Sequence, residues 1–284
     1  MKNIVTLFLT VVFSLSLLAN VPNAEKKILI QLYQNTNGNQ WKVKWDLNAG
    51  VETWYGIKIK NDRVIAINLS NNNLVGTLPS EITDLKNLEV LNLFKNKISG
   101  EIPNSIGKLK NLKELNLAFN KLSGEIPDSI CEITSLNKLL LFMNGLSGHL
   151  PSRIGDLKEL EVVSLFCNKL SGDLPVALYD LKNLKELALS SNDFSGHISS
   201  KVENLVSLKD LALFDNKMNG QIPFNIVKLE NLENINLAYN SFSGYVPNDL
   251  AQKDGFNLTM RNESGVAFQL EVVNTSKGIL AADE

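Results

Sequence analysis

The chain has 284 residues, of which 44% are hydrophobic and 20% charged, and its formal net charge is −2. A near-neutral chain without a basic tract lacks the charge for an electrostatic grip on nucleic acid or on an anionic membrane surface. The length allows one large domain or two small ones, and the internal repeat described below favours one continuous array.

The first segment is typical of a secretory signal peptide. One lysine is followed by a mostly apolar run at residues 4–18 and then by small residues up to Ala24. The run is short and is interrupted by Thr10, Ser14 and Ser16, which fits a cleaved signal better than a membrane span. An uncleaved anchor is the alternative.

We therefore expect residues 1–24 to be a signal peptide that is cleaved near Ala19 or Ala24. Its removal takes Lys2 away and changes the net charge from −2 to −3. No other stretch is long and apolar enough to cross a bilayer. The prediction is a secreted or cell-surface protein, extracellular or periplasmic, with no stable membrane insertion after signal removal.

Residues 25–63 lack the repeat and are predicted to form an N-terminal cap. Apolar residues at helical spacing, namely Ile28, Leu29, Leu32 and Tyr33, predict a short amphipathic helix. Farther on, Ile57 and Ile59 alternate with lysines before Asn61-Asp62, a pair that tolerates a tight turn, so a hairpin with residues 64–69 is expected. Three tryptophans, Trp41, Trp45 and Trp54, are interpreted as a plug over the open end of the core. A ligand cage is the alternative.

One asparagine recurs every 24 residues without a slip. The column consists of Asn72, Asn96, Asn120, Asn144, Asn168, Asn192, Asn216 and Asn240. A fixed period of this length, with one polar residue in an apolar frame, indicates a solenoid. Eight repeats are expected over residues 64–255, and they begin at Val64, Leu88, Leu112, Leu136, Leu160, Leu184, Leu208 and Leu232.

Each repeat divides into physical parts. In the second one, Leu91 and Leu93 alternate as inward side chains of a short strand, and Asn96 follows at a turn. Stacked asparagines are predicted to form a ladder that satisfies buried backbone groups. Ile106 and Leu109 give the apolar side of a loose helical turn. Seven of the eight prolines share one repeat position, where Ser199 is the single departure, and this coil is expected to be slightly looser.

The repeats resemble those of plant-type extracellular leucine-rich repeat proteins. Residues 112–133, LKELNLAFNKLSGEIPDSICEI, are similar to the pattern LxxLxLxxNxLSGxIPxxIGxL, and the resemblance covers residues 64–255. It implies an α/β solenoid in which a parallel sheet lines a concave face. A second short sheet is implied at the Ser-Gly-x-Ile-Pro segment, with short helical turns on the convex side. It also implies use as an extracellular binding surface, without naming a ligand.

The cap refines this resemblance. Residues 54–57, Trp-Tyr-Gly-Ile, are similar to the end of the N-terminal cap of plant ectodomains, but the paired cysteines of that cap are absent. Secreted bacterial proteins built on the same repeat share a segment like residues 35–41 and dispense with the disulfides. The chain therefore looks closest in kind to them.

Aromatic residues gather at positions that face outward from the concave strands. Five of the twelve phenylalanines lie in the two rows that follow the inward leucines, where the repeat needs nothing apolar. With adjacent strands about 4.8 Å apart, the members from successive repeats would form one patch about 14 Å long. The predicted ligand-binding residues are Phe94, Phe119, Phe142, Met143, Phe166, Phe214 and Tyr239. An exposed aromatic cluster often marks an interaction site, whereas rings that pack on one another and stiffen the sheet are the alternative.

A second column contains both histidines of the chain. It runs Thr77, Glu101, Glu125, His149, Asp173, His197, Gln221 and Tyr245. A metal or pH-sensitive edge could be built there, but a solvated polar stripe is the interpretation we favour, so no metal site and no cofactor are predicted. Cys131 and Cys167 occupy different repeat positions and would have to come within about 7 Å at their α-carbons to bridge. Two free thiols are expected.

Catalytic constellations are missing from the sequence. Neither histidine has a nucleophile beside it in the predicted stack, and there is no phosphate loop or cysteine–histidine metal spacing. We do not expect an enzyme.

Beyond the array, residues 256–284 are predicted to form a C-terminal cap hairpin and tail. Phe256, Leu258 and Met260 alternate before a turn, and Val266, Phe268, Leu270 and Val272 alternate after it. Such a hairpin would seal the last coil.

The sequence thus predicts a secreted recognition module that binds an extracellular protein or peptide on its concave face. One alternative is a structural or adhesive surface protein that uses its outer columns. Another is an ice- or glycan-binding solenoid that acts through the outer columns or the concave asparagines.

Overall fold

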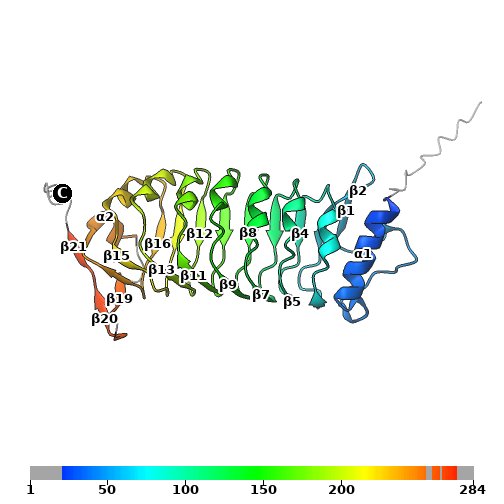
Figure 1. The fold of residues 1–284 in the computed structure, drawn as a ribbon, viewed down its shortest axis with the longest axis horizontal. Coiled ribbons are helices and arrows are strands. Elements are labelled where there is room, and N and C mark those ends of the chain that lie inside the picture. The colour runs from blue at the N-terminus through cyan, green and yellow to red at the C-terminus, as the bar shows by residue number, and fades with distance from the viewer. Residues whose placement is uncertain (1–20, 254–257, 263, 274–284) are drawn as a thin grey trace, which may run out of the picture.

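A nine-stranded sheet runs the length of the molecule in the computed structural model, which describes residues 21–253, 258–262 and 264–273 (Figure 1). Its strands, in spatial order, are β1 (Ile57–Lys60), β2 (Arg63–Asn68), β4 (Val90–Asn92), β6 (Glu114–Asn116), β8 (Lys138–Leu140), β10 (Val162–Ser164), β12 (Glu186–Ala188), β14 (Asp210–Ala212) and β16 (Asn234–Asn236). β1 is antiparallel to β2 and the other neighbours are parallel. From β2 on, each residue pairs with the residue 24 positions later, as Leu91 does with Leu115. The expected leucine-rich repeat solenoid is confirmed.

A second set of short strands follows the turn of each coil. One six-stranded sheet contains β3 (Val75–Thr77), β5 (Lys97–Gly100), β7 (Lys121–Gly124), β9 (Gly145–Gly148), β11 (Lys169–Asp173) and β13 (Asp193–Ser195), and β15 (Asn219–Gln221) pairs with β17 (Ser241–Ser243). The prediction placed this sheet at the Ser-Gly-x-Ile-Pro segment. The strands overlap the first part of this segment: β5 contains Ser99 and Gly100, begins two residues earlier and ends before Ile102-Pro103, where proline cannot donate to a sheet.

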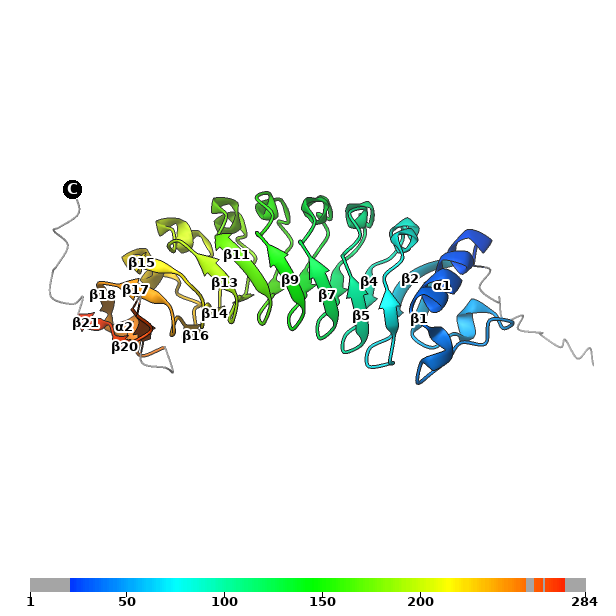
Figure 2. The same cartoon turned by 60° about the horizontal axis from the view of Figure 1, so that its bottom comes forward.

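Short 3₁₀ helices form the remaining side of the coils, as expected for a convex side with helical turns. They span Ser80–Asp84, Ile106–Lys108, Asp128–Glu132, Ile154–Asp156, Val176–Asp180, Ser200–Asn204 and Phe224–Lys228. Figure 2 shows the coils side by side along the curved array, between α1 at one end and β20 and β21 at the other. The leucines and isoleucines of all three sides point inward and form one continuous core.

The recurring asparagines join each coil to the next. The Oδ1 atom of Asn96 accepts hydrogen bonds from the backbone N–H groups of Asn72 and Leu74, both at 3.0 Å. Its Nδ2 group donates to the carbonyl oxygens of Leu69 and Leu93, both at 2.9 Å. Similar bonds recur at the later members of the column. Throughout the described residues, no buried side-chain nitrogen or oxygen lacks a partner.

At the N-terminal end, helix α1 (Asn23–Asn35) covers the core with Leu29 and Leu32, which are fully buried. The tight turn expected between β1 and β2 is present, with positive φ at Asn61 and Asp62. Two further 3₁₀ turns, Gly38–Gln40 and Val51–Thr53, complete this end. The three tryptophans are buried here and pack on one another: the ring centroids of Trp45 and Trp54 are 4.8 Å apart. Their burial favours the interpretation of a plug.

At the C-terminal end, β18 (Tyr245–Pro247) and the turn α2 (Asn248–Ala251) precede the hairpin of β19 (Thr259–Arg261) and β20 (Ala267–Gln269). β21 (Glu271–Val273) then pairs with β18 in parallel. Leu258 and Met260 are buried, whereas Phe256 lies outside the described residues. The alternation from Val266 to Val272 does not produce a buried face. Of these residues only Leu270 is buried, because among the described strands β20 pairs with β19 alone.

Candidate binding surface

From β2 on, a residue with left-handed backbone conformation lies three positions after the end of each concave strand. Lys95, Phe119, Met143 and Cys167 have φ between 54° and 58°, and the corresponding residues of the other coils share this conformation. It is uncommon for residues other than glycine and costs of order 1 kcal/mol or more. The same residue's N–H donates to the next coil, as from Phe119 to the carbonyl of Phe142 at 2.8 Å. Since all eight coils share the turn, it belongs to the fold rather than to a specific site.

Four of the predicted ligand-binding rings are in contact on this face. The rings of Phe142 and Phe166 stack with centroids 4.5 Å apart and an interplanar angle of 10°. Phe94 joins this pair, with its centroid 6.1 Å from that of Phe142 and 6.3 Å from that of Phe119. We call these four residues, together with Met143, the aromatic cluster.

The exposure of the aromatic cluster is uneven. Phe119 is 43% exposed and Met143 is 41% exposed, whereas Phe94, Phe142 and Phe166 are half-buried. The stack of Phe142 on Phe166 fits the stiffening alternative, since two rings of adjacent coils protect each other. Stiffening does not account for the exposure of Phe119 and Met143. The cluster therefore combines a rigid base with an apolar surface open to solvent.

The other two predicted residues form a separate pair near the C-terminal end. The rings of Phe214 and Tyr239 meet edge to face at 5.1 Å. The guanidinium of Arg261 lies 4.3 Å above the Tyr239 ring, and its Nη1 atom is 3.8 Å from the Asp215 carboxylate. Sequence patterns could not place Arg261 there, because it comes from the cap hairpin, which has no repeat. Ser190 occupies the row position between Phe166 and Phe214, so the pair is not continuous with the aromatic cluster.

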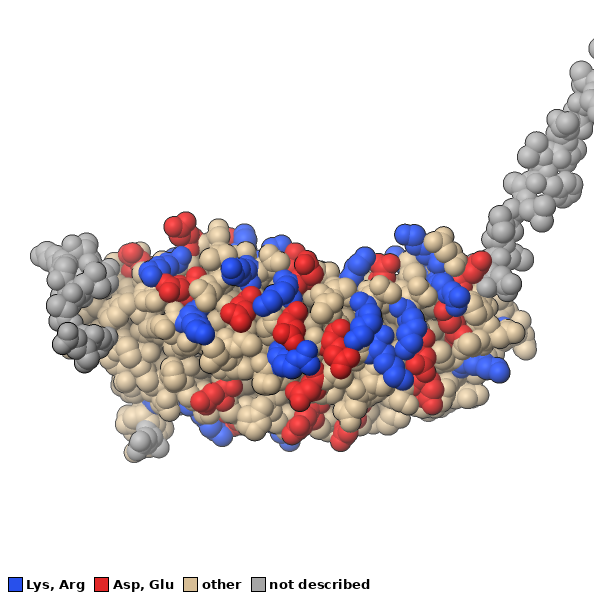
Figure 3. Space-filling model, turned by 45° about the horizontal axis from the view of Figure 1, so that its top comes forward, with Lys and Arg blue, Asp and Glu red and all other residues tan. Residues whose placement is uncertain are grey.

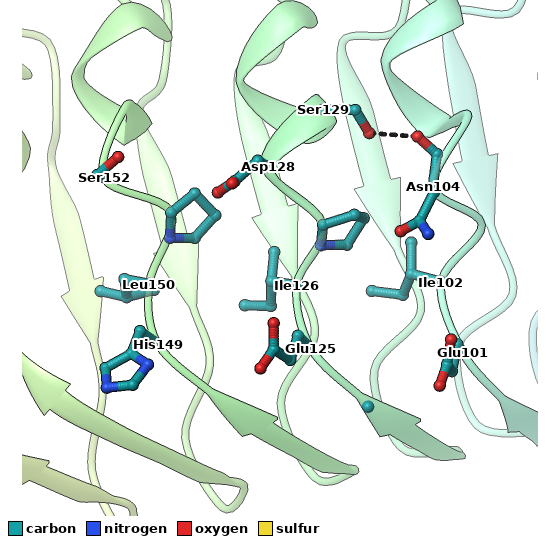
Figure 4. Close-up of a pocket in the computed structure, with 13 residues that line it drawn as sticks. Glu101, Ile102, Asn104, Glu125, Ile126, Asp128, Ser129, His149, Leu150 and Ser152 are labelled. Atoms are coloured by element: carbon teal, nitrogen blue, oxygen red, sulfur yellow. Dashed lines mark hydrogen bonds between the residues drawn. The ribbon is translucent and has the colours of Figure 1, made fainter.

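The polar column lines a groove on another side of the coils. Figure 4 shows Glu101, Glu125 and His149 in a row on successive coils, beside the apolar residues that follow each of them. The groove has a volume of 790 Å³. The side chain of Glu125 lies across Gly148, where a Cβ atom would come within 2.7 Å of the glutamate Cγ. Among the described residues, no group of three histidine, cysteine or acidic side chains is arranged to hold a metal ion.

Charges on the outer sides are largely paired between coils. Figure 3 shows positive and negative side chains next to one another over the coils. Examples are Lys113 with Glu89 at 2.7 Å and Lys185 with Glu161 at 2.8 Å, each 24 residues apart. Exposed pairs of this kind contribute at most about 1 kcal/mol each. These ion pairs join neighbouring coils, and they leave little net charge on the outer sides for a partner to bind.

The two cysteines are free, as expected, and differ in environment. Cys131 is buried behind the array, and burial, followed by the nearby Asp128 carboxylate, raises the pKa of its thiol to about 11. Cys167 lies at the end of a concave strand and is partly exposed. No helix among the residues that the structure describes is long and apolar enough to cross a membrane.

Family models match several parts of the repeat array. The model for two-copy leucine-rich repeats matches residues 86–138, and the single leucine-rich repeat model matches residues 63–85, 183–205 and 231–252. The chain matches no curated protein.

Solved structures extend the similarity to nearly the whole chain. One is the ectodomain of the Arabidopsis receptor kinase HAESA, solved in complex with an N-terminal extended IDA peptide hormone ligand. It is 30% identical to this chain, with a TM-score of 0.73, and the match covers 89% of this chain and 41% of that chain. A chain in the BIR3–SERK2 complex from Arabidopsis thaliana is 31% identical, and the match covers 58% of this chain and 92% of that one with a TM-score of 0.50.

A plant ice-binding protein is 22% identical, with 90% of this chain and 99% of that one covered and a TM-score of 0.59. At that identity the likeness shows the fold alone. The chain spans less than half the length of the first three solved chains that it matches, at 37%, 32% and 41%.

Proposed function

We propose that this chain, which belongs to the leucine-rich repeat family and resembles the ectodomains of plant receptors, is an extracellular recognition module that binds a protein or peptide on its concave face. The observation that carries the proposal is the aromatic cluster, which combines the stacked rings of Phe142 and Phe166 with the exposed side chains of Phe119 and Met143. Rigid aromatic side chains bind at a low cost in conformational entropy and dominate the energetics of many interfaces.

The similar structures support the class of ligand. The HAESA ectodomain is solved with a peptide hormone, and a second match is to a complex between two proteins. Both share this chain's repeat at 30% identity or more. A non-catalytic role is typical of leucine-rich repeat ectodomains and forms part of this proposal.

The closer kinship with secreted bacterial repeat proteins stays a prediction. It depends on residues 35–41 and on the absence of cysteines from the cap, and the solved structures reported above are of plant proteins or plant receptor ectodomains. Secretion likewise stays a prediction that depends on residues 1–24.

The ice- or glycan-binding alternative is less well supported by the geometry. The concave asparagine row is interrupted after Asn116 by Leu140 and Ser164. The Oδ1 atoms of Asn92 and Asn116 accept hydrogen bonds from the backbone N–H groups two residues later, at 3.1 and 3.2 Å. On the concave face, the regular polar array that ice binding would need is therefore short. We expect no thermal hysteresis from the purified protein, and a clear freezing-point gap would favour this alternative.

The test of the proposal exploits the natural variation of the repeat. Ser70 and Ser190 occupy the same repeat position as Phe142 and Phe166, so a Phe142→Ser, Phe166→Ser variant keeps a residue that the fold already accepts there. The control variant is Val176→Ser, Val206→Ser, which removes two apolar side chains that are 56% and 52% exposed away from the concave face.

The three proteins are immobilised and compared by affinity capture from an extracellular extract, after circular dichroism has confirmed their folding. A specific partner should be held by the wild type and the control, and its affinity for the serine variant should fall at least tenfold. If the two rings are central anchors of the interface, their truncation costs about 2 kcal/mol or more, and about 1.4 kcal/mol corresponds to tenfold. Equal capture by all three proteins would refute the aromatic cluster as the binding site.

A further inference from the structure

A line of lysines borders the aromatic cluster along one edge of the concave face. Lys95 belongs to the same turn row as Phe119, and Lys97, Lys121 and Lys169 follow two residues after that row in their coils. All four are exposed. In the first coil, Lys42 of the cap reaches the same row, where its Nζ atom donates to Oδ1 of Asn71 at 2.8 Å. We call these five lysines the basic rim.

The basic rim carries no compensating acid along its own line. At these two repeat positions, the first five coils have no aspartate or glutamate. The acids of this line begin at Asp193 and Asp215, which are already paired with Lys217 and Arg261. None of the five rim lysines forms an ion pair with a described residue, in contrast to the matched lysines on the outer sides, such as Lys113 and Lys185.

The rim and the rings form one surface. The Nζ atom of Lys95 lies over the ring of Phe119, 5.9 Å from its centroid. Phe119 in turn contacts Phe94, which contacts Phe142. A ligand that covers the rings therefore lies within reach of several positive charges. Lys97 and Lys121 are on adjacent coils, whose strands are about 4.8 Å apart, and Lys169 is two coils beyond Lys121, because Gly145 occupies the position between them.

We infer, as a refinement of the function proposed above, that the ligand is an acidic peptide segment, in which apolar side chains cover the aromatic cluster and carboxylates lie beside the basic rim. In an extended peptide, successive side chains point to opposite sides, so apolar and acidic residues can alternate between the rings and the rim. Complementary charge speeds the encounter and fixes the register of the peptide. The chain as a whole has a net charge of −2, so this attraction is local to the rim.

The rings distinguish this occupant from an anionic polysaccharide. A polyanion would be held by the lysines alone, since its charged groups gain nothing from Phe142 and Phe166. A peptide with apolar anchors requires both the rim and the rings. The two cases therefore respond differently to loss of the rings.

The experiment pans a phage-displayed library of random dodecapeptides on the full chain and measures binding of the selected peptides by fluorescence anisotropy. The rim variant is Lys97→Gln, Lys121→Gln, Lys169→Gln. Its matched control is Lys158→Gln, Lys182→Gln, Lys201→Gln, which neutralises three lysines that are also exposed and lie in or next to the 3₁₀ helices. The ring variant is again Phe142→Ser, Phe166→Ser, which leaves the charge unchanged. Heparin serves as the polyanion probe.

Selected peptides should be enriched in aspartate and glutamate next to apolar residues. Their affinity should fall about tenfold in the rim variant and in the ring variant, stay unchanged in the lysine control, and weaken as salt rises, because exposed charge pairs are screened. Peptides that need the rings but show no acidic enrichment, or that bind the rim variant equally well, would overturn this inference and leave the proposed function standing.

Two other outcomes also count against the inference. Heparin binding that is lost in the rim variant but kept in the ring variant, without any ring-dependent peptide, would assign the rim to a polyanion. If all selected peptides bind the ring variant as tightly as the wild type, the proposed function also loses its support.

Discussion

At the scale of single residues, the recurring asparagine side chains join each coil to its neighbour by hydrogen bonds. Asn192 is buried, and its Oδ1 atom accepts a hydrogen bond from the N–H of Leu170 at 3.0 Å. Its Nδ2 group donates to the carbonyls of Leu165 and Leu189, both at 3.0 Å. One side chain therefore bonds to backbone groups of two neighbouring coils, and it is the acceptor for the Leu170 N–H, whereas the Leu165 and Leu189 carbonyls also accept from Asn168 and Asn216.

Replacement of this residue tests the ladder. Asn192→Ala leaves the buried N–H of Leu170 without its acceptor, while the Leu165 and Leu189 carbonyls keep their bonds from Asn168 and Asn216. The free energy of unfolding should therefore fall by about 1–3 kcal/mol. Urea denaturation measures the change. Asn183→Ala is the control, because its exposed amide donates only to the carbonyl of Lys158 at 2.9 Å, and a loss within about 0.5 kcal/mol is expected. Equal losses in the two variants would contradict the role given to the ladder.

The two thiols should differ in reactivity. Because burial raises the pKa of Cys131 from 9.0 to about 11, its thiol stays protonated at pH 8, and the thiolate is the reactive form. Iodoacetamide at pH 8 should therefore label Cys167 in the folded protein and both cysteines in urea, as read by peptide mass spectrometry.

The same shift has a pH dependence with a definite sign. The folded-state pKa lies above the unfolded one, so the contribution of Cys131 to stability is complete below pH 9 and is lost as the pH rises toward about 11. In a Cys131→Ala variant, this part of the alkaline decline of the unfolding free energy should disappear. Rapid labelling of Cys131 in the folded protein would show that the thiol is not buried as described.

At the scale of one coil, the departure from the proline pattern has a local compensation. The N–H of Ser199 donates to the hydroxyl of Tyr179 at 3.1 Å, and Tyr179 is buried in the preceding helical turn. A proline would fit the backbone, since φ at Ser199 is −66°, but it has no N–H to donate. The second sheet ends at β13 in this same coil, whereas the concave sheet continues through β14 and β16, so the coil is locally different without a break in the stack.

A double-mutant cycle tests this compensation. Ser199→Pro alone should lower the free energy of unfolding by about 1 kcal/mol, because the Tyr179 hydroxyl loses its donor. In a Tyr179→Phe background the same change should be neutral or stabilising, since proline restricts the unfolded chain and no hydroxyl is left unpaired. The bond from the Lys201 N–H to the Ser199 hydroxyl is lost in both backgrounds and cancels. Additive effects of the two substitutions would show that the pair is not coupled.

The sequence predicted the array well because each repeat presents the same local pattern eight times. Leu91 and Leu93 identify an inward-facing strand by alternation alone, and Asn61-Asp62 identifies a turn by its tolerance of positive φ. The bounds of the strands in the second sheet were harder to predict from the sequence. These strands are defined by pairing between coils, as between Gly76 and Ile98, and not by a pattern within one coil.

The candidate surface was predictable in outline and not in detail. Their positions in the repeat placed Phe94, Phe119 and Phe142 on one face. Their relative exposure depends on the ring rotamers and on the left-handed turn, and the turn could not be predicted because a different residue type occupies it in each coil. Arg261 and the exposure of Phe268 could not be predicted, because the C-terminal cap has no period to fix its register against the array.

At the scale of the whole molecule, the N-terminal cap bears on where a signal peptide would end. Val21 is buried, and the carbonyl of Pro22 accepts the first helical hydrogen bond, from the N–H of Lys26 at 3.1 Å. Cleavage after Ala24 would remove these contacts together with the first residues of α1.

We therefore propose cleavage after Ala19 rather than after Ala24. Intact-mass measurement of the exported protein should give a mature chain that begins at Asn20. A mature chain that begins at Glu25 would mean that the core tolerates the loss of Val21, and the cap described above would then need revision.

The most direct test of the central claim, that partners bind on the concave aromatic cluster, is site-specific photocrosslinking. Phe119, exposed on the concave face, is replaced by p-benzoylphenylalanine in one protein, and Val176, exposed on the helical side, is replaced in another. Both proteins are irradiated in an extracellular extract. The account predicts a covalent adduct of defined mass from position 119 and none from position 176. Adducts from position 176 alone, or the same adducts from both positions, would contradict it.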